Sequence, residues 1–112
     1  MPDGVRLQQG LMDALREMRE AQRMMAGLGR KRAEAEREYR VAIRTRTLWE
    51  REKGTPATYM SDVVRGYQDI AQLRLERDVA DAEYEANREA VNVAKKTVDT
   101  FREVIAREYA AR

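Results

Sequence analysis

The sequence predicts an all-α protein, a long antiparallel helical hairpin similar to a coiled coil, and three observations support this prediction. Two long ladders of mostly apolar residues repeat every seven residues, in steps that alternate between four and three residues. A short segment with glycine, proline and no charge separates the ladders, and 38% of the chain is charged. Sustained seven-residue periodicity is typical of helices that supercoil around one another.

The first ladder predicts a helix over residues 5–53. Its seven-residue phase continues unshifted through Gly27 and Gly29. Two glycines cost a helix interior roughly 2 kcal/mol relative to alanine. We therefore expect a bend or break at 27–29 in an otherwise continuous helix. The alternative is a turn there that folds residues 5–26 back as a separate helix.

A turn is expected over residues 54–57. Gly54 suits the left-handed conformation that closes a helix, and Lys53 before it complements the helix dipole. Thr55 precedes a proline, which disfavours the helical conformation for Thr55. Turns this short connect antiparallel helices, so the two ladders should pack against each other.

The second ladder predicts a helix over residues 58–111. Thr58 or Ser61 can cap its N-terminus by accepting a hydrogen bond from the first turn. Gly66 indicates a kink in this helix. The alternative is that Gly66 ends a short helix near 58–65.

Two registers of the hairpin are compatible with the ladders. In the first, a tight turn places Leu28 opposite Tyr84 and Leu11 opposite Phe101. The second slides one helix by seven residues and places Ala35 opposite Tyr84. Because the second requires a loop seven residues longer, we prefer the first.

A further apolar seam on the second helix predicts a homo-oligomer. Its members are Leu75, Val79, Ala82, Ala86, Ala90, Val93 and Val104, with Thr97 and Thr100 in the gap before the last. A helix with two apolar faces needs two neighbours, and a hairpin supplies one. Another copy of the chain is the commonest second neighbour, so we expect an assembly, most simply a dimer that forms a four-helix bundle. Folding back of the N-terminal segment is the alternative.

Composition limits the chemistry. The 112 residues form one small domain without cysteine or histidine, so disulfides, Cys/His zinc sites and nucleophile–histidine pairs are excluded. We expect no catalytic residue, no metal and no cofactor. The chain lacks a signal peptide and any apolar run of about 18 residues, which favours a cytoplasmic protein without a membrane segment. A net charge of +2 gives nucleic-acid binding little support.

Hydroxyl, aromatic and arginine side chains gather around the turn and form the candidate binding site. These residues are Thr55, Thr58, Tyr59, Ser61, Arg65 and Tyr67. A tyrosine ring could stack on a base, with the arginine on a phosphate and the hydroxyls as further donors. The alternative is a well-capped hairpin end without a ligand. Arg30 and Lys31, beside the two glycines of the first ladder, are candidate phosphate contacts.

The pattern G-T-P-A-T-Y-M-S-D-V-V-R-G, followed by L-R-L-E-R-D-V-A-D-A-E-Y-E-A, resembles small uncharacterised helical proteins of bacteriophages and prophages over residues 33–110. The resemblance implies an accessory protein in the cytoplasm of a host bacterium and carries no known site residues. By analogy of size, fold and context, it suggests anti-defence proteins that sequester cyclic-nucleotide signals.

Three functions follow from these patterns. The leading one is a non-enzymatic homo-oligomer that binds a host defence protein or another host factor, or sequesters a nucleotide or cyclic-nucleotide immune signal. The second is a nucleic-acid-binding accessory protein of phage recombination or replication, with a basic face of Arg30, Lys31, Arg37, Arg40 and Arg44. The third is a structural or assembly coiled coil whose tip binds nothing.

Overall fold

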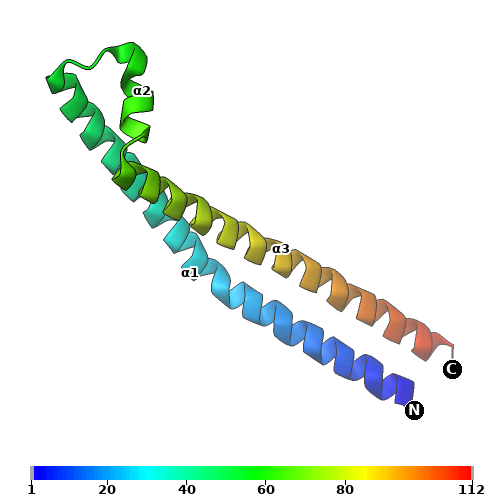
Figure 1. The fold of residues 1–112 in the computed structure, drawn as a ribbon. Coiled ribbons are helices and arrows are strands. Elements are labelled where there is room, and N and C mark those ends of the chain that lie inside the picture. The colour runs from blue at the N-terminus through cyan, green and yellow to red at the C-terminus, as the bar shows by residue number, and fades with distance from the viewer. Residues whose placement is uncertain (1, 112) are drawn as a thin grey trace. The chain divides into compact units, whose positions relative to one another are not determined.

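The computed structural model describes residues 2–111, and all of the regular structure in this range is helical (Figure 1). Helix α1 spans Pro2–Lys53, α2 spans Ala57–Arg65 and α3 spans Gln68–Ala110. The long helices α1 and α3 run in opposite directions, which confirms the all-α antiparallel hairpin. None of the helices within the described range has the length and hydropathy needed to cross a membrane.

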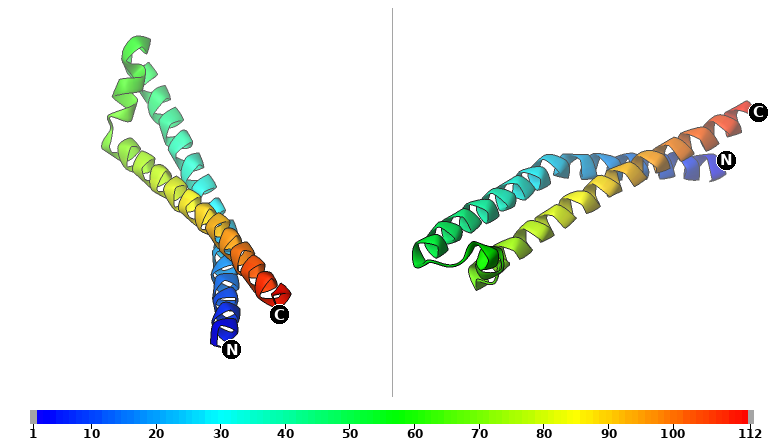
Figure 2. Two further views of the ribbon diagram at one scale, coloured as in Figure 1. Left: turned by 90° about the vertical axis from the view of Figure 1, so that its right-hand side faces the viewer. Right: turned by 90° about the horizontal axis from the view of Figure 1, so that it is seen from above.

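The chain divides into two compact units. Unit 1 combines residues 2–26 of α1 with residues 85–111, and unit 2 consists of residues 27–84 and includes α2. In both, a segment of α1 packs against an antiparallel segment of α3 (Figure 2). The division arises because each unit buries its own set of side chains.

Unit 1 has a core of small side chains. Its buried residues are Ala14, Ala21, Val91, Ala94 and Val98. The ring of Phe101 packs against Gly10, where an added Cβ would lie 2.5 Å from two ring carbons. Asn87 Nδ2 donates to the Ala21 carbonyl at 2.8 Å, so this polar ladder position fastens α3 to α1. The Phe101 contact matches the first of the two registers.

Unit 2 buries larger side chains. Its core residues are Tyr39, Val64, Ile70 and Ala80. The ring of Tyr84 lies 3.5 Å from the position that a Cβ on Gly29 would occupy. Because Tyr84 meets Gly29, next to Leu28 and distant from Ala35, unit 2 also follows the first register.

The two glycine-containing segments behave differently. Helix α1 continues through Gly27 and Gly29, so residues 5–26 do not form a separate helix. The helix expected over 58–111 is instead two helices, because α2 ends at Gly66, whose N–H donates to the Asp62 carbonyl at 3.1 Å. The change of direction lets both α2 and α3 contribute a buried side chain to unit 2.

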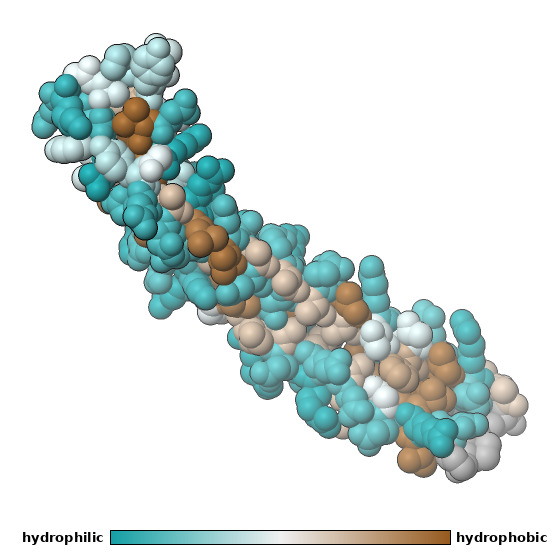
Figure 3. All heavy atoms as spheres, in the orientation of Figure 1, coloured by the Kyte–Doolittle hydropathy of each residue, from teal (hydrophilic) through white to brown (hydrophobic). Residues whose placement is uncertain are grey.

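The second apolar seam of α3 is exposed in the chain. Leu75 is 56% exposed, Val79 45% and Val93 52%. In the surface view, brown and tan apolar side chains lie in bands between teal charged ones (Figure 3). Apart from the half-buried Val104, the residues of the seam are exposed within the described chain, as the spacing of apolar residues predicted for a face that needs another neighbour.

Candidate binding surface at the hairpin tip

The hairpin tip, residues 50–67, begins with a tight helix end. Gly54 adopts a φ of +88°, the left-handed conformation that favours glycine. Its N–H donates to the Arg51 carbonyl at 3.0 Å, and the Thr55 N–H donates to the Glu50 carbonyl at 3.1 Å. These two bonds form a Schellman motif, which satisfies carbonyls at the end of α1. Chain reversal therefore brings Thr55 back beside Glu50.

Helix α2 begins without a side-chain cap, contrary to the expectation that Thr58 or Ser61 would supply one. Its N-cap is Pro56, in an extended conformation with φ −61° and ψ 140°. Both Thr58 and Ser61 lie inside the helix. The Tyr59 N–H instead donates to the Pro56 carbonyl at 3.0 Å. The hydroxyls of Thr58 and Ser61 are thus not used to cap α2.

Glu50 is the centre of the polar contacts at the tip. Its side chain is buried, with the residue only 2% exposed. Thr55 Oγ1 donates to Glu50 Oε2 at 2.5 Å, and the Tyr67 hydroxyl donates to Glu50 Oε1. The bond from Thr55, followed by that from Tyr67, holds the pKa of Glu50 below its ordinary value. Two of the six candidate site residues therefore serve an internal carboxylate.

Arg46 covers the ring of Tyr67. Its guanidinium carbon lies 4.4 Å from the centre of the Tyr67 ring and 5.8 Å from the Trp49 ring, and its Nη2 pairs with Asp69 Oδ2 at 3.1 Å. The Trp49 and Tyr67 rings meet edge to face, with centroids 6.3 Å apart. Tyr67 is therefore a packing residue, and the proposed stacking of a base on its ring loses the face that Arg46 occupies.

The other four candidate residues lie on exposed surfaces of α2. Helical periodicity places Thr58, Ser61 and Arg65 on one face, and Tyr59 lies beside Val63 on the adjoining face. Tyr59 is 62% exposed and Val63 38%. Within residues 2–111, none of the side chains of Thr58, Tyr59, Ser61 and Arg65 has a hydrogen bond or ion pair. These residues together with Val63 are called the α2 surface below.

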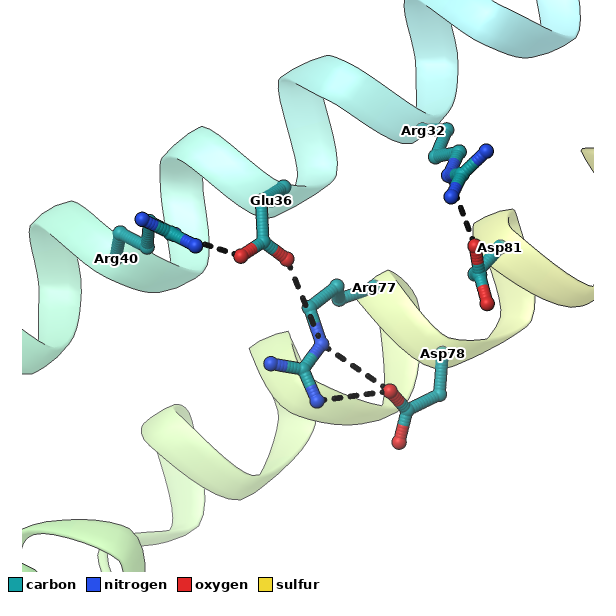
Figure 4. Close-up of polar contacts among 6 residues, drawn as sticks. All are labelled: Arg32, Glu36, Arg40, Arg77, Asp78 and Asp81. Atoms are coloured by element: carbon teal, nitrogen blue, oxygen red, sulfur yellow. Dashed lines mark hydrogen bonds and ion pairs between the residues drawn. The ribbon is translucent and has the colours of Figure 1, made fainter.

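A cleft in unit 2 carries balanced charge. It has a volume of about 510 Å³ and is lined by three arginines and three acids (Figure 4). These are Arg32, Glu36, Arg40, Arg77, Asp78 and Asp81. Their ion pairs span 2.7 to 3.7 Å. Because each guanidinium has a carboxylate partner, the cleft holds no spare positive charge for a phosphate.

The two candidate phosphate contacts on α1, Arg30 and Lys31, lie in different environments. Lys31 Nζ pairs with Glu83 at 2.9 Å and so joins α1 to α3. Arg30 is exposed and has no partner among residues 2–111. The structure therefore assigns Lys31 to an ion pair and leaves Arg30 facing solvent.

Arg30 belongs to a row of arginines that lies outside the apolar ladders. Arginine recurs every seven residues along α1, at Arg16, Arg23, Arg30, Arg37, Arg44 and Arg51. The last four lie in unit 2, where they are exposed and without an ion pair among the described residues. Seven residues of helix correspond to about 10.5 Å. The regular spacing is visible in the sequence once polar residues are tested for periodicity.

The chain matches no family model, and neither a curated protein nor a solved structure matches it. Within residues 2–111, no group of three or more Asp and Glu side chains could hold a metal ion. In the same range, no buried side-chain nitrogen or oxygen lacks a hydrogen-bond partner. At the tip, Thr58, Tyr59, Ser61 and Arg65 of α2 are among the exposed polar side chains without partners in this range.

Proposed function

We propose that this protein is a non-enzymatic binding protein that assembles with copies of itself and contacts a protein partner through the α2 surface. One observation supports the contact most directly. The side chains of Tyr59 and Arg65 are exposed on a helix held in place by the buried residue Val64. Tyrosine and arginine are enriched among the residues that dominate protein–protein binding energy. The exposed seam of α3 supports the assembly.

The internal contacts at the tip favour a protein partner over a nucleotide. Thr55 and Tyr67 were candidates for holding a nucleotide, and both donate their hydroxyls to Glu50. A small ligand needs a concave site with converging polar groups. On the α2 surface, the tyrosine and the arginine lie on different faces of the helix and do not converge. This suits a broad protein contact, and nucleotide sequestration becomes the competing outcome of the test.

We also propose a biological setting for this protein. The sequence resemblance supports an origin in a bacteriophage or prophage, and hence action on a host factor in a bacterial cytoplasm. Interference with bacterial defence is the form of this activity that we propose first. A host protein engaged by the α2 surface would be its target.

Affinity capture with matched variants tests the proposed contact. Wild-type protein, Tyr59→Ala/Arg65→Ala and the control Arg19→Ala/Met24→Ala are immobilised and exposed to a bacterial lysate. The control also changes two exposed side chains, on α1. A host protein captured by wild type and control but depleted at least about tenfold by the tip variant supports the proposal. Equal capture by all three contradicts it.

A thermal-shift panel distinguishes the nucleotide alternative. Wild type is heated with cyclic di- and oligonucleotides, and any ligand released on denaturation is examined for chemical change. Ligand binding to the folded state raises the melting temperature by mass action. A rise with one nucleotide that is recovered intact would replace the protein partner by a sequestered signal.

The arginine row supports a second candidate function, the binding of nucleic acid. Arg30, Arg37, Arg44 and Arg51 share the face of α1 that is turned away from the unit 2 core, and they have no intrachain acid partner among the described residues. Guanidinium groups bind phosphates well. Of the basic face expected from sequence, Lys31 and Arg40 pair with acids, so the row replaces that face as the candidate phosphate surface.

Salt dependence tests this second function. If all four arginines contact phosphates of single-stranded nucleic acid, the slope of log K against log salt is about −3. Changing the four to glutamine should abolish binding. The control changes Arg16 and Arg23 to glutamine, because these pair with Asp13 and Glu20. Binding that is absent, or that does not respond to salt, excludes the function.

A further inference from the structure

Unit 1 carries an apolar hollow on the exposed seam of α3. It measures about 350 Å³. Its floor consists mainly of small side chains from both helices: Ala21, Ala86, Ala90 and Ala94, with Val93 and Thr97 at one end. Val93 is 52% exposed. A hollow of alanines next to a projecting valine allows the close approach of another helix, because only short side chains separate the two backbones.

We propose that this hollow receives Val93 of a second copy of the chain, with the two α3 helices antiparallel across a two-fold axis that passes between residues 91 and 92. The inference rests on the assembly part of the proposed function and specifies its contact. In this arrangement Val93 lies level with the second copy's Ala90, and Ala86 lies level with its Thr97. A larger side chain faces a smaller one at each level, as close packing requires. A two-fold axis makes each contact occur twice.

Charge at the rim favours a second copy as the occupant. Glu89 lines the hollow, and Lys96 lies seven residues further along α3, on the same side of the seam. Within residues 2–111, the side chains of Glu89 and Lys96 form no ion pair. The antiparallel arrangement places Glu89 of each copy beside Lys96 of the other, which gives two opposite-charge pairs next to the apolar contact. Helix α3 therefore supplies the projecting Val93, most of the hollow, and both the acidic and the basic side chain at its rim.

Glu17 and Ala21 of α1 form the wall of the hollow on the side away from Glu89. Glu17 is exposed and its carboxylate remains at the edge in water. The seam continues past the hollow, where a second depression of about 300 Å³ is lined by Val93, Thr97, Thr100 and Val104 among others. Lys96, the proposed partner of Glu89, also lines this second depression, so a charged side chain flanks the seam beyond the hollow.

Charge exchange in the full-length chain tests the arrangement by sedimentation equilibrium. Glu89→Lys and Lys96→Glu each replace two attractive pairs with two repulsive ones, and each should raise the dimer dissociation constant about tenfold. The double variant Glu89→Lys/Lys96→Glu restores opposite charges and should return to within about threefold of wild type. A parallel dimer would not show this restoration, because the two residues would not face each other.

Val93→Asp tests the apolar contact. A carboxylate facing the second copy's Ala90 should raise the dissociation constant at least about tenfold. Val41→Asp is the matched control, since Val41 is 60% exposed on α1 of unit 2. Far-UV circular dichroism establishes that both variants retain their helices.

The outcomes separate this inference from the proposed function. A dimer weakened by Val93→Asp and by each single charge reversal, and restored by the double variant, supports the interface. An oligomer that ignores all of these changes, or that the double variant fails to restore, overturns the interface but leaves assembly standing. A chain that is monomeric at every concentration overturns both, and the seam then belongs to another partner.

Discussion

Three of the glycines in α1, Gly10, Gly27 and Gly29, allow a sharp test of the helix, because the same substitution should have opposite effects at different positions. Glycine destabilises a helix interior by about 1 kcal/mol relative to alanine. An added Cβ at Gly27 would meet nothing within 4 Å. We therefore expect Gly27→Ala to raise the free energy of unfolding by about 1 kcal/mol, or about 4 °C in the melting temperature.

Gly10→Ala should behave differently. The new Cβ would lie 2.5 Å from Cε1 and Cζ of Phe101, whereas carbon atoms in good contact are about 3.5 to 4.0 Å apart. The ring must move by about 1 Å, and such overpacking costs about 1–3 kcal/mol. Since both substitutions gain the same helix propensity, the difference between Gly27→Ala and Gly10→Ala measures the overpacking and should equal about 1–3 kcal/mol.

Urea unfolding followed by circular dichroism at 222 nm measures these differences at one fixed protein concentration, because assembly also stabilises the folded state. Gly29→Ala is an intermediate case, with its Cβ at an ordinary 3.5 Å from Tyr84. If Gly27→Ala destabilised the protein by about 1 kcal/mol or more, the helix would have to break at this position in a conformation that alanine resists. The continuity of α1 would then be refuted.

Four further predictions concern the tip and the two cores. The lowered pKa of Glu50 contributes stability that is present above its ordinary value of 4.5 and is lost as the pH falls through the lowered pKa; Glu50→Gln should flatten this part of the pH profile in urea unfolding. The raised pKa of Tyr67 contributes stability that is present below its ordinary value of 10 and is lost as the pH rises through the raised pKa. Tyr67→Phe should therefore remove this loss of stability at alkaline pH. Ile70 is 1% exposed, and Ile70→Ala should cost about 2–5 kcal/mol, against about 0.5 kcal/mol or less for Val41→Ala, as read from denaturant midpoints. Asn87→Ala removes the hydrogen bond to the α1 backbone and should cost about 1 kcal/mol in the same assay, a value near zero showing that the bond is dispensable.

The helices and their antiparallel pairing could be predicted from the sequence. Seven-residue periodicity predicts α1 and α3, and the short turn around Gly54 predicts the register in which Phe101 meets Gly10. For Gly66, the sequence left two alternatives open: a kink within one long helix, or the end of a short helix. Sequence could not decide this point, because the outcome depends on whether Val64 and Ile70 reach one core, which is a property of packing in three dimensions.

The candidate site was predicted less completely than the fold. Composition around the turn drew attention to the correct segment, but it could not separate hydroxyls that serve Glu50 from those that face solvent. Glu50 looks like any other acid in a charged helix, and its burial depends on chain reversal at the Schellman motif. The arginine row lies outside the apolar ladders, so the periodicity of apolar residues does not reveal it.

The separation of the two units along the chain has a consequence for synthesis and folding. Glu50 and Tyr67 are 17 residues apart, whereas Ala21 and Asn87 are 66 residues apart. Loop-closure entropy therefore disfavours the Ala21–Asn87 contact by about 1.2 kcal/mol more. On the ribosome, residues 2–26 wait about 3 to 12 s for residues 85–111 to be made. We therefore expect unit 2 to form before unit 1, because its contacts at the tip close a shorter loop and are synthesised together.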